Sequence, residues 1–172
     1  MFMTIKNSGL AIRNRPTEPR LSARQVWDAV AHTSFAVLSH VTPAGAPRSS
    51  GVVYAVSDGS MYVAVAPDSW KARHICADGL VAVTVPVRRG GLLSLLLPIP
   101  PATVSFPAVA TLRTADVLDE VPGLSTLLPA GRRTNCTILE IRPMGHFVTY
   151  GIGVPLRRMR DPSRSRARVL VD

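Results

Sequence analysis

Polar residues at the start of one predicted strand and basic residues at the start of one predicted helix are the groups here that could bind an anion. Arg48 and residues 49–51 (Ser-Ser-Gly) open an otherwise apolar strand. Ser69 and Lys71 stand at a helix N-terminus, where free backbone N–H groups and the helix dipole favour negative charge. The pattern predicts a phosphate pocket if the two elements meet. The alternative is a plain helix cap at Asp68 or Ser69, with both basic side chains in solvent.

Other reactive side chains show no catalytic or metal-binding spacing. The four histidines are His32, His40, His74 and His146, and they form no ligand pair such as H-x-x-x-H. We therefore expect structural roles for them, with His74, three residues after Lys71, best placed to touch a bound ligand. Cys76 and Cys136 lie 60 positions apart without a C-x-x-C motif, which is typical of reduced thiols. No metal site and no Ser-His-Asp or Cys-His catalytic group can be identified.

Residue patterning places the candidate residues in a mainly β chain. Alternating or continuous apolar runs predict the strands, and Pro, Gly, Asp and Ser clusters predict the turns between them. We expect helices at residues 22–32 and 70–77, a short helical or looped stretch at 117–128, and strands at 35–41, 46–56, 61–66, 80–87, 103–114 and 135–150, the last as one strand or a bent pair broken near residues 143–145. Six strands with short flanking helices predict an antiparallel β-barrel.

Length and charge divide the chain into a core domain with basic ends. The 172 residues suit one domain, and 47% hydrophobic against 18% charged residues exclude a disordered chain. Of the net charge of +9, residues 1–20 carry +3 and residues 156–172 carry +4, which leaves +2 for the middle. We expect an irregular basic N-terminal segment at 1–20, a barrel at 21–155 and a basic solvated tail at 156–172. With aromatic residues at only 5%, a nucleic-acid-binding barrel is disfavoured.

The most apolar run is too short to cross a membrane. Residues 92–99 form only eight positions, whereas a membrane-spanning helix needs about twenty apolar residues. Residues 1–20 contain no apolar signal core, so we expect a soluble, cytoplasmic protein. The Gly-, Leu- and Pro-rich insertion at 88–101 is either an apolar loop at a dimer interface or a wall over a substrate site. Both interpretations imply a partner surface.

The order of features over residues 35–87 resembles the pyridoxamine 5′-phosphate oxidase-like family of flavin-binding split β-barrels. A short strand ends at Val41, a strand with a polar start follows at Arg48, and residues 57–60 (Ser-Asp-Gly-Ser) form an acidic-glycine hairpin. The helix Ser69-x-Lys71-x-x-His74-Ile75 and an apolar strand complete the pattern. The resemblance extends over residues 21–150 and lies in order and spacing, since no single motif is diagnostic.

The resemblance implies a homodimer with two cofactor sites at the subunit interface. The cofactor would be FMN or the deazaflavin F-420, with haem, which a few members bind, the less favoured choice. The cofactor-binding positions that it implies are Arg48, Ser49, Ser50, Gly51, Ser69, Trp70, Lys71 and His74. In this assignment Arg48 and Lys71 contact the phosphate, Ser69 supports it by hydrogen bonding, and residues 49–51 line the ribityl chain or the ring. Trp70 departs from the family, which often has a basic or small residue there.

The resemblance also implies an oxidoreductase that transfers a hydride to or from a small, mainly apolar organic substrate. Such a protein needs no catalytic triad, because the cofactor carries the hydride chemistry and the protein orients the reactants. The authentic pyridoxamine phosphate oxidase has an Arg-x-His-type motif near its C-terminus, and residues 145–151 (Gly-His-Phe-Val-Thr-Tyr-Gly) lack it. We therefore do not expect vitamin B6 oxidation. The alternatives are a non-catalytic flavin- or haem-binding protein and, less favoured, the nucleic-acid-binding barrel.

Overall fold

The computed structural model describes residues 21–88, 101–133, 135–155, 159, 161 and 165–171. Its helical elements are α1 (Ala23–Ala31), α2 (Trp70–Ala77), α3 (Val117–Glu120) and the 3-10 turns η2 (Ser125–Leu127) and η3 (Ala130–Arg132). Its strands are β1 (Phe35–Val41), β2 (Pro47–Val53), β3 (Ala55–Ser57), β4 (Ser60–Val65), β5 (Leu80–Val87), β6 (Ala102–Arg113), β7 (Thr137–Pro143), β8 (His146–Tyr150) and β9 (Arg166–Leu170).

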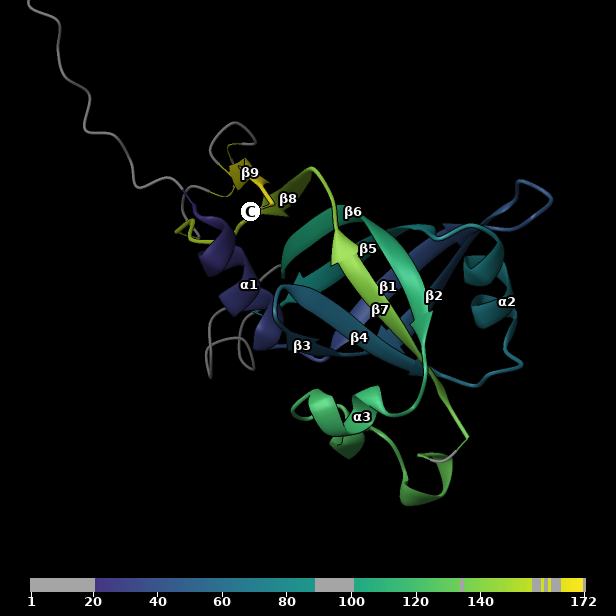
Figure 1. Cartoon of the computed structure of the whole chain (residues 1–172). Coiled ribbons are helices and arrows are strands. Elements are labelled where there is room, and N and C mark those ends of the chain that lie inside the picture. Colours follow the sequence, from purple (N-terminus) through teal and green to yellow (C-terminus); the bar gives the residue numbers. More distant parts are fainter. Residues whose placement is uncertain are drawn as a thin grey trace, which may run out of the picture.

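The strands form one antiparallel sheet that curls into a half-barrel (Figure 1). The hydrogen-bonded order is β2-β1-β5-β6-β7-β4-β3, and β8 pairs with β6 and with β9. The two ends of this path, β2 and β3, are consecutive in the chain and are separated only by Tyr54. The Tyr54 N–H donates to the Ser34 carbonyl at 3.1 Å, which extends the β1–β2 pairing by one residue before β3 begins. The sheet therefore turns back on itself, as predicted for an antiparallel split β-barrel with short flanking helices.

The structure has more strands than the six predicted. The strand expected at 46–56 is divided at Tyr54 into β2 and β3, and the stretch at 135–150 is the bent pair β7 and β8. Strand β6 is long enough to pair with both halves of that bend, with Ser105 opposite Val148 and Ala108 opposite Pro143. The bend is bridged by a hydrogen bond of 2.8 Å from the Met144 N–H to the Pro107 carbonyl.

The prediction of a solvated tail from residue 156 onward is wrong for Arg166–Leu170, which forms strand β9 against β8. Its apolar residues alternate with arginines, so Val169 is buried in the core while Arg166 and Arg168 are exposed. The high arginine content of this stretch hid the strand period from composition-based reasoning. Residues 1–20 and most of the predicted insertion at 88–101 lie outside the described residues.

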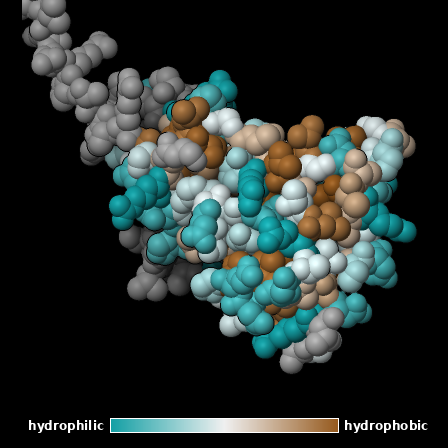
Figure 2. Space-filling view, viewed as in Figure 1, coloured by the Kyte–Doolittle hydropathy of each residue, from teal (hydrophilic) through white to brown (hydrophobic). Residues whose placement is uncertain are grey.

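Two helices cover the two ends of the main core (Figure 1). Helix α1 starts in a capping box between Ser22 and Gln25 and buries Val26 and Val30, whereas α2 buries Ile75 at the other end. Helix α3 and η2 cover a second apolar cluster on the outer face of β4 and β7. In the same view, Figure 2 shows apolar residues in patches separated by hydrophilic ones. No helix within the described residues is long and apolar enough to cross a membrane.

The outer face of β2, β1, β5 and the first part of β6, as far as Val109, carries no charged side chain, whereas β6 continues outward with Thr111 and Arg113. Cross-strand pairing aligns these strands, for example Ser49 with Ser39, Ser39 with Ala82 and Ala82 with Pro107. The outward-facing residues are Pro47, Ser49, Gly51, Val53, Phe35, Val37, Ser39, Val41, Leu80, Ala82, Thr84, Pro86, Thr103, Ser105, Pro107 and Val109. A solvent-facing antiparallel sheet normally has polar and charged residues at such positions, so this surface, the uncharged outer face, is unusual.

Candidate functional site

Strand β2 and helix α2 meet at one end of the barrel, beside a pocket of about 340 Å³. The residues lining it are Arg48, Ser49, Trp70 and His74. All four are positions that the family resemblance assigns to a cofactor, although strands β3 and β4 lie between their two elements in the chain. The structure thus brings the polar start of the strand to the basic helix.

A second pocket, of about 330 Å³, lies alongside the first, because the lining residues Trp70 and Lys71 are consecutive. It is lined by Phe35, Gly51, Val52, Val53, Val63, Ala64 and Lys71, so apart from one lysine its walls are small or apolar. Gly51 is needed there, since a Cβ atom at this position would lie 2.8 Å from the Phe35 ring. The group that approaches this glycine closely is therefore an aromatic side chain of the same chain.

The N-terminus of α2 is capped by Ser69, whose hydroxyl accepts a hydrogen bond of 3.2 Å from the Ala72 N–H. This is the cap expected of a serine at this position, and it takes up the Ser69 hydroxyl. The Ser69 and Ala72 N–H groups are bonded within this segment, which leaves the N–H groups of Trp70 and Lys71 as the donors without an intrahelical partner. The Lys71 ammonium nitrogen lies 5.8 Å from the centre of the Trp70 ring. The helix start therefore combines free N–H donors with one nearby cation.

The two neighbouring serines of β2 differ in their hydrogen bonding. The Ser49 hydroxyl pairs with that of Ser39 on β1 at 2.7 Å, on the outer side of the sheet. The Ser50 hydroxyl faces the other way, is buried, and has no hydrogen-bond partner within the described residues. A buried hydroxyl without a partner is costly. Ser50 itself lines neither pocket, although Arg48 and Val52, on the same face of β2, line one pocket each.

His40 is a residue of this site that sequence reasoning missed. It lies on β1 opposite Arg48, and its Nε2 is 3.2 Å from Nδ1 of His74. Its ring stacks on Trp70, with 5.3 Å between ring centres and 28° between ring planes. The alternation of side chains along the strand could have indicated this, since His40 falls on the same face as the buried Ala36 and Leu38. A polar side chain on a core-facing position needs a partner, and here it is a second histidine.

The surroundings of His40 disfavour its charged form. Only 4% of the residue is exposed, and burial is the main cause that lowers its pKa below the ordinary value. His74, Lys71 and Arg48 lower the pKa further by charge repulsion. The site is thus a region of converging positive charge, which would suit an anionic group.

Known structures share this architecture, although no protein-family model and no curated protein sequence matches the chain. A Listeria innocua protein named after pyridoxamine 5′-phosphate oxidase superimposes with a TM-score of 0.54 at 12% identity, covering 70% of this chain and 91% of its own. The chain has the pyridoxamine 5′-phosphate oxidase-like fold. An F420 reductase matches with a TM-score of 0.52 at 18% identity, covering 70% of this chain and 93% of its own.

The same fold is found in a heme binding protein from Mycobacterium smegmatis. Its TM-score is 0.60 at 19% identity, and the match covers 77% of this chain but only 55% of that protein. Proteins with this split barrel are therefore named for different cofactors. At these identities the comparison establishes the fold alone, and the choice of cofactor has to be argued from the site.

The described residues of the site fit a phosphate-bearing tricyclic cofactor. Arg48 and Lys71 supply positive charge, one in each pocket, and the start of α2 supplies N–H donors. The adjoining pocket has small or apolar walls, which suit a ring system, and both volumes fall within the usual range for ligand pockets. No group of three or more potential metal ligands occurs among the described residues.

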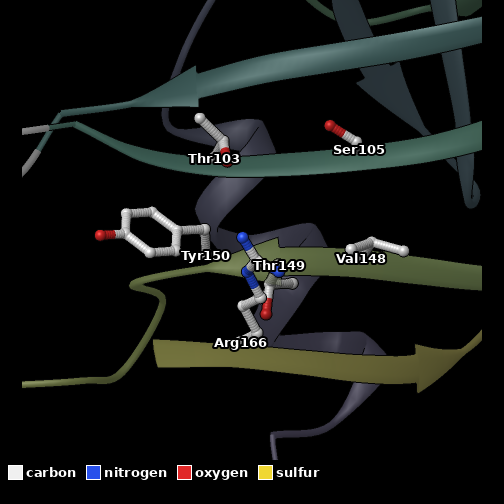
Figure 3. Close-up of a pocket in the computed structure, with 6 residues that line it drawn as sticks. All are labelled: Thr103, Ser105, Val148, Thr149, Tyr150 and Arg166. Carbon is white, nitrogen blue, oxygen red and sulfur yellow. The ribbon is translucent and has the colours of Figure 1, made fainter. Parts of the chain in front are cut away.

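A further pocket, of about 440 Å³, lies elsewhere, on the part of the sheet where β8 runs between β6 and β9 (Figure 3). It is lined by Thr103, Ser105, Val148, Thr149, Tyr150 and Arg166. In Figure 3 the arginine comes from β9 and lies next to Thr149. Sequence reasoning assigned no function to these residues, and none of them belongs to the site at β2 and α2.

Proposed function

We propose that this chain binds a flavin-type cofactor, FMN or the deazaflavin F-420, and acts as an oxidoreductase on a small, mainly apolar organic substrate. One observation carries the proposal. Strand β2 and helix α2, far apart in the sequence, place two cations and a helix N-terminus beside a pocket with small apolar walls. A phosphate needs the cations and the helix N-terminus, and a stacked ring needs the apolar pocket.

The chain's own residues would bind and orient the cofactor. Arg48 and Lys71 would hold the phosphate by charge-assisted hydrogen bonds, with the N–H groups of the first α2 turn as further donors. The Ser50 hydroxyl would gain the partner that it lacks. The bound cofactor would supply the hydride transfer, whereas the protein would orient the reactants and exclude water from the cofactor ring. Val52, Val53 and Val63 would keep water away from the ring, which favours an apolar substrate on its open side.

We also propose that the active form is a homodimer, joined through the uncharged outer face. This face runs over four strands without one charged residue, whereas a monomer in water would gain from charges there. Ser49, Gly51 and Val53 of the site strand belong to the same face. Joining two copies through it would therefore bring the second subunit to the edge of the cofactor pocket.

Titration of the purified protein with FMN, F-420 and haem, followed by absorbance and fluorescence, tests the proposal. We expect saturable binding of FMN or F-420, near one molecule per subunit. Binding of haem alone would instead favour the haem-binding function named for one structural neighbour. Lys71→Ala should weaken binding, since a charge-assisted contact is worth about 1.5–3 kcal/mol, or roughly 10- to 150-fold in affinity. Arg73→Ala is the matched control, because Arg73 is an exposed cation of the same helix that lines neither pocket.

A further inference from the structure

His40, which is buried, and His74, which is partly exposed, form a pair at the candidate phosphate site. His74 lines the pocket with Arg48, and His40 lies behind it, stacked on Trp70. The centres of the two imidazole rings are 5.4 Å apart, and one nitrogen of each ring faces the other at 3.2 Å. His40 thus does not line the pocket itself but adjoins three residues that do, His74, Trp70 and Arg48.

The geometry of this contact fixes how many protons the pair can hold. A hydrogen bond between Nε2 of His40 and Nδ1 of His74 needs one hydrogen, so one of these nitrogens donates and the other accepts. If both rings were protonated, two N–H groups would face each other across 3.2 Å. The pair can therefore be neutral or carry one positive charge without breaking its contact, but it cannot carry two.

The charged groups around His40 are all cationic. Helix α2 contributes Lys71 and His74, and strand β2 contributes Arg48. On the remaining side the partner of His40 on β5 is Val81, which carries no charge. No carboxylate contributes to the lowered pKa of His40. Burial and these neighbours therefore disfavour the charged form of His40, and an added negative charge would offset the repulsion.

We propose that an anion bound at Arg48 and Lys71 draws one proton onto the His40–His74 pair, so that anion binding and proton uptake are coupled. This inference rests on the proposed phosphate site and adds that the site takes up a proton when the anion binds. The anion offsets the repulsion from the two cations, and the proton, taken from solvent, is shared across the Nε2–Nδ1 contact. By linkage, if the bound anion favours protonation of the pair, the affinity of the protein for the anion must rise as the pH falls. His40 is in this scheme a positioning residue, which acts on the anion through His74.

Calorimetric titration with FMN, in buffers that differ in ionisation enthalpy, measures the protons taken up on binding. We expect the affinity of the wild type to rise between pH 8 and pH 6 by about tenfold more than that of His40→Asn, the effect of about one pKa unit in the pair. The FMN phosphate itself titrates near pH 6, but it does so equally with each protein, so the difference between proteins isolates the pair. Riboflavin, which lacks the phosphate, should show no such difference between the two proteins.

Two further variants keep the test decisive. If His40→Asn fails to fold, His74→Asn removes the other half of the pair from a partly exposed position on α2 and should show the same loss of proton uptake. His32→Gln is the control, because His32 is exposed at the end of α1, which covers the opposite end of the barrel (Figure 1). Equal proton uptake in the wild type and in the pair variants, with FMN bound to all, would overturn this inference and leave the proposed function intact. If neither FMN nor F-420 binds the wild type, both proposals are wrong.

Discussion

Replacing Ser50 by alanine should stabilise the ligand-free protein and weaken cofactor binding. The Ser50 hydroxyl is buried without a partner, and an unsatisfied buried polar group costs about 1–3 kcal/mol. Because the residue as a whole is half-buried, we expect a gain near the lower limit, about 1 kcal/mol. In the complex the same change removes one neutral hydrogen bond, worth about 0.5–1.5 kcal/mol, or roughly 2- to 13-fold in affinity.

The neighbouring serine provides the matched control. The Ser49 hydroxyl already bonds to Ser39 at 2.7 Å, so Ser49→Ala should lower the free energy of unfolding by about 1 kcal/mol. Urea unfolding of the ligand-free variants, with unchanged m-values, measures both changes, and FMN titration measures the affinity of Ser50→Ala. If Ser50→Ala were as destabilising as Ser49→Ala, the Ser50 hydroxyl would have a partner after all. An unchanged FMN affinity would remove Ser50 from the site.

Three other perturbations test the electrostatics and the assembly. Because the lowered pKa of His40 leaves the unfolded chain binding more protons, the free energy of unfolding should fall as the pH drops below 6.5, and urea unfolding of His40→Asn at pH 7.5 and 5.5 should show a smaller fall. The Glu140 side chain is 4% exposed and bonds to Arg113 at 3.0 Å and Arg142 at 2.6 Å. Changing both arginines to leucine should cost about 3–5 kcal/mol, and adding Glu140→Gln should recover most of it in urea unfolding. Ala82→Asp, at the centre of the uncharged outer face, should shift the protein towards monomer in sedimentation velocity, and an unchanged dimer would place the interface elsewhere.

The sequence predicted local elements accurately where their ends are marked. The strands at 35–41 and 80–87 and the helix at 70–77 have the predicted bounds. In each case a proline, glycine or capping residue stands next to the apolar pattern, and these residues act on the backbone directly. Strand β9 was missed because arginines occupy its alternate positions and make the stretch resemble a solvated tail. Its pairing with β8 identifies it as a strand.

The candidate site was predictable in its residue types but not in its assembly. The polar start of β2 and the basic start of α2 could be recognised, yet physics alone did not bring them together, and the family resemblance supplied that step. His40 and His74 are 34 positions apart, and their contact depends on β1 and α2 packing at one end of the barrel. Arg113 and Glu140, 27 positions apart, likewise meet only because β6 pairs with β7. Interactions of this kind are set by the fold, so they cannot be inferred from local spacing.

The break that divides the sheet also opens the pocket. Strand β2 pairs with β1 as far as Val53, and β3 then pairs only with residues 60–62 of β4. Between them the Tyr54 N–H is still bonded to the Ser34 carbonyl, and the Tyr54 hydroxyl donates to the Val30 carbonyl of α1 at 2.8 Å. The remaining part of β4, from Val63 onward, pairs with β7 on one side and has no ladder to β2 on the other. Residues 51–53 and 63–64 therefore face each other across a gap instead of a row of hydrogen bonds, and this gap is the apolar pocket next to Lys71. The anchoring of one tyrosine to α1, at the far end from α2, is thus part of what makes room for a ring beside the anion site.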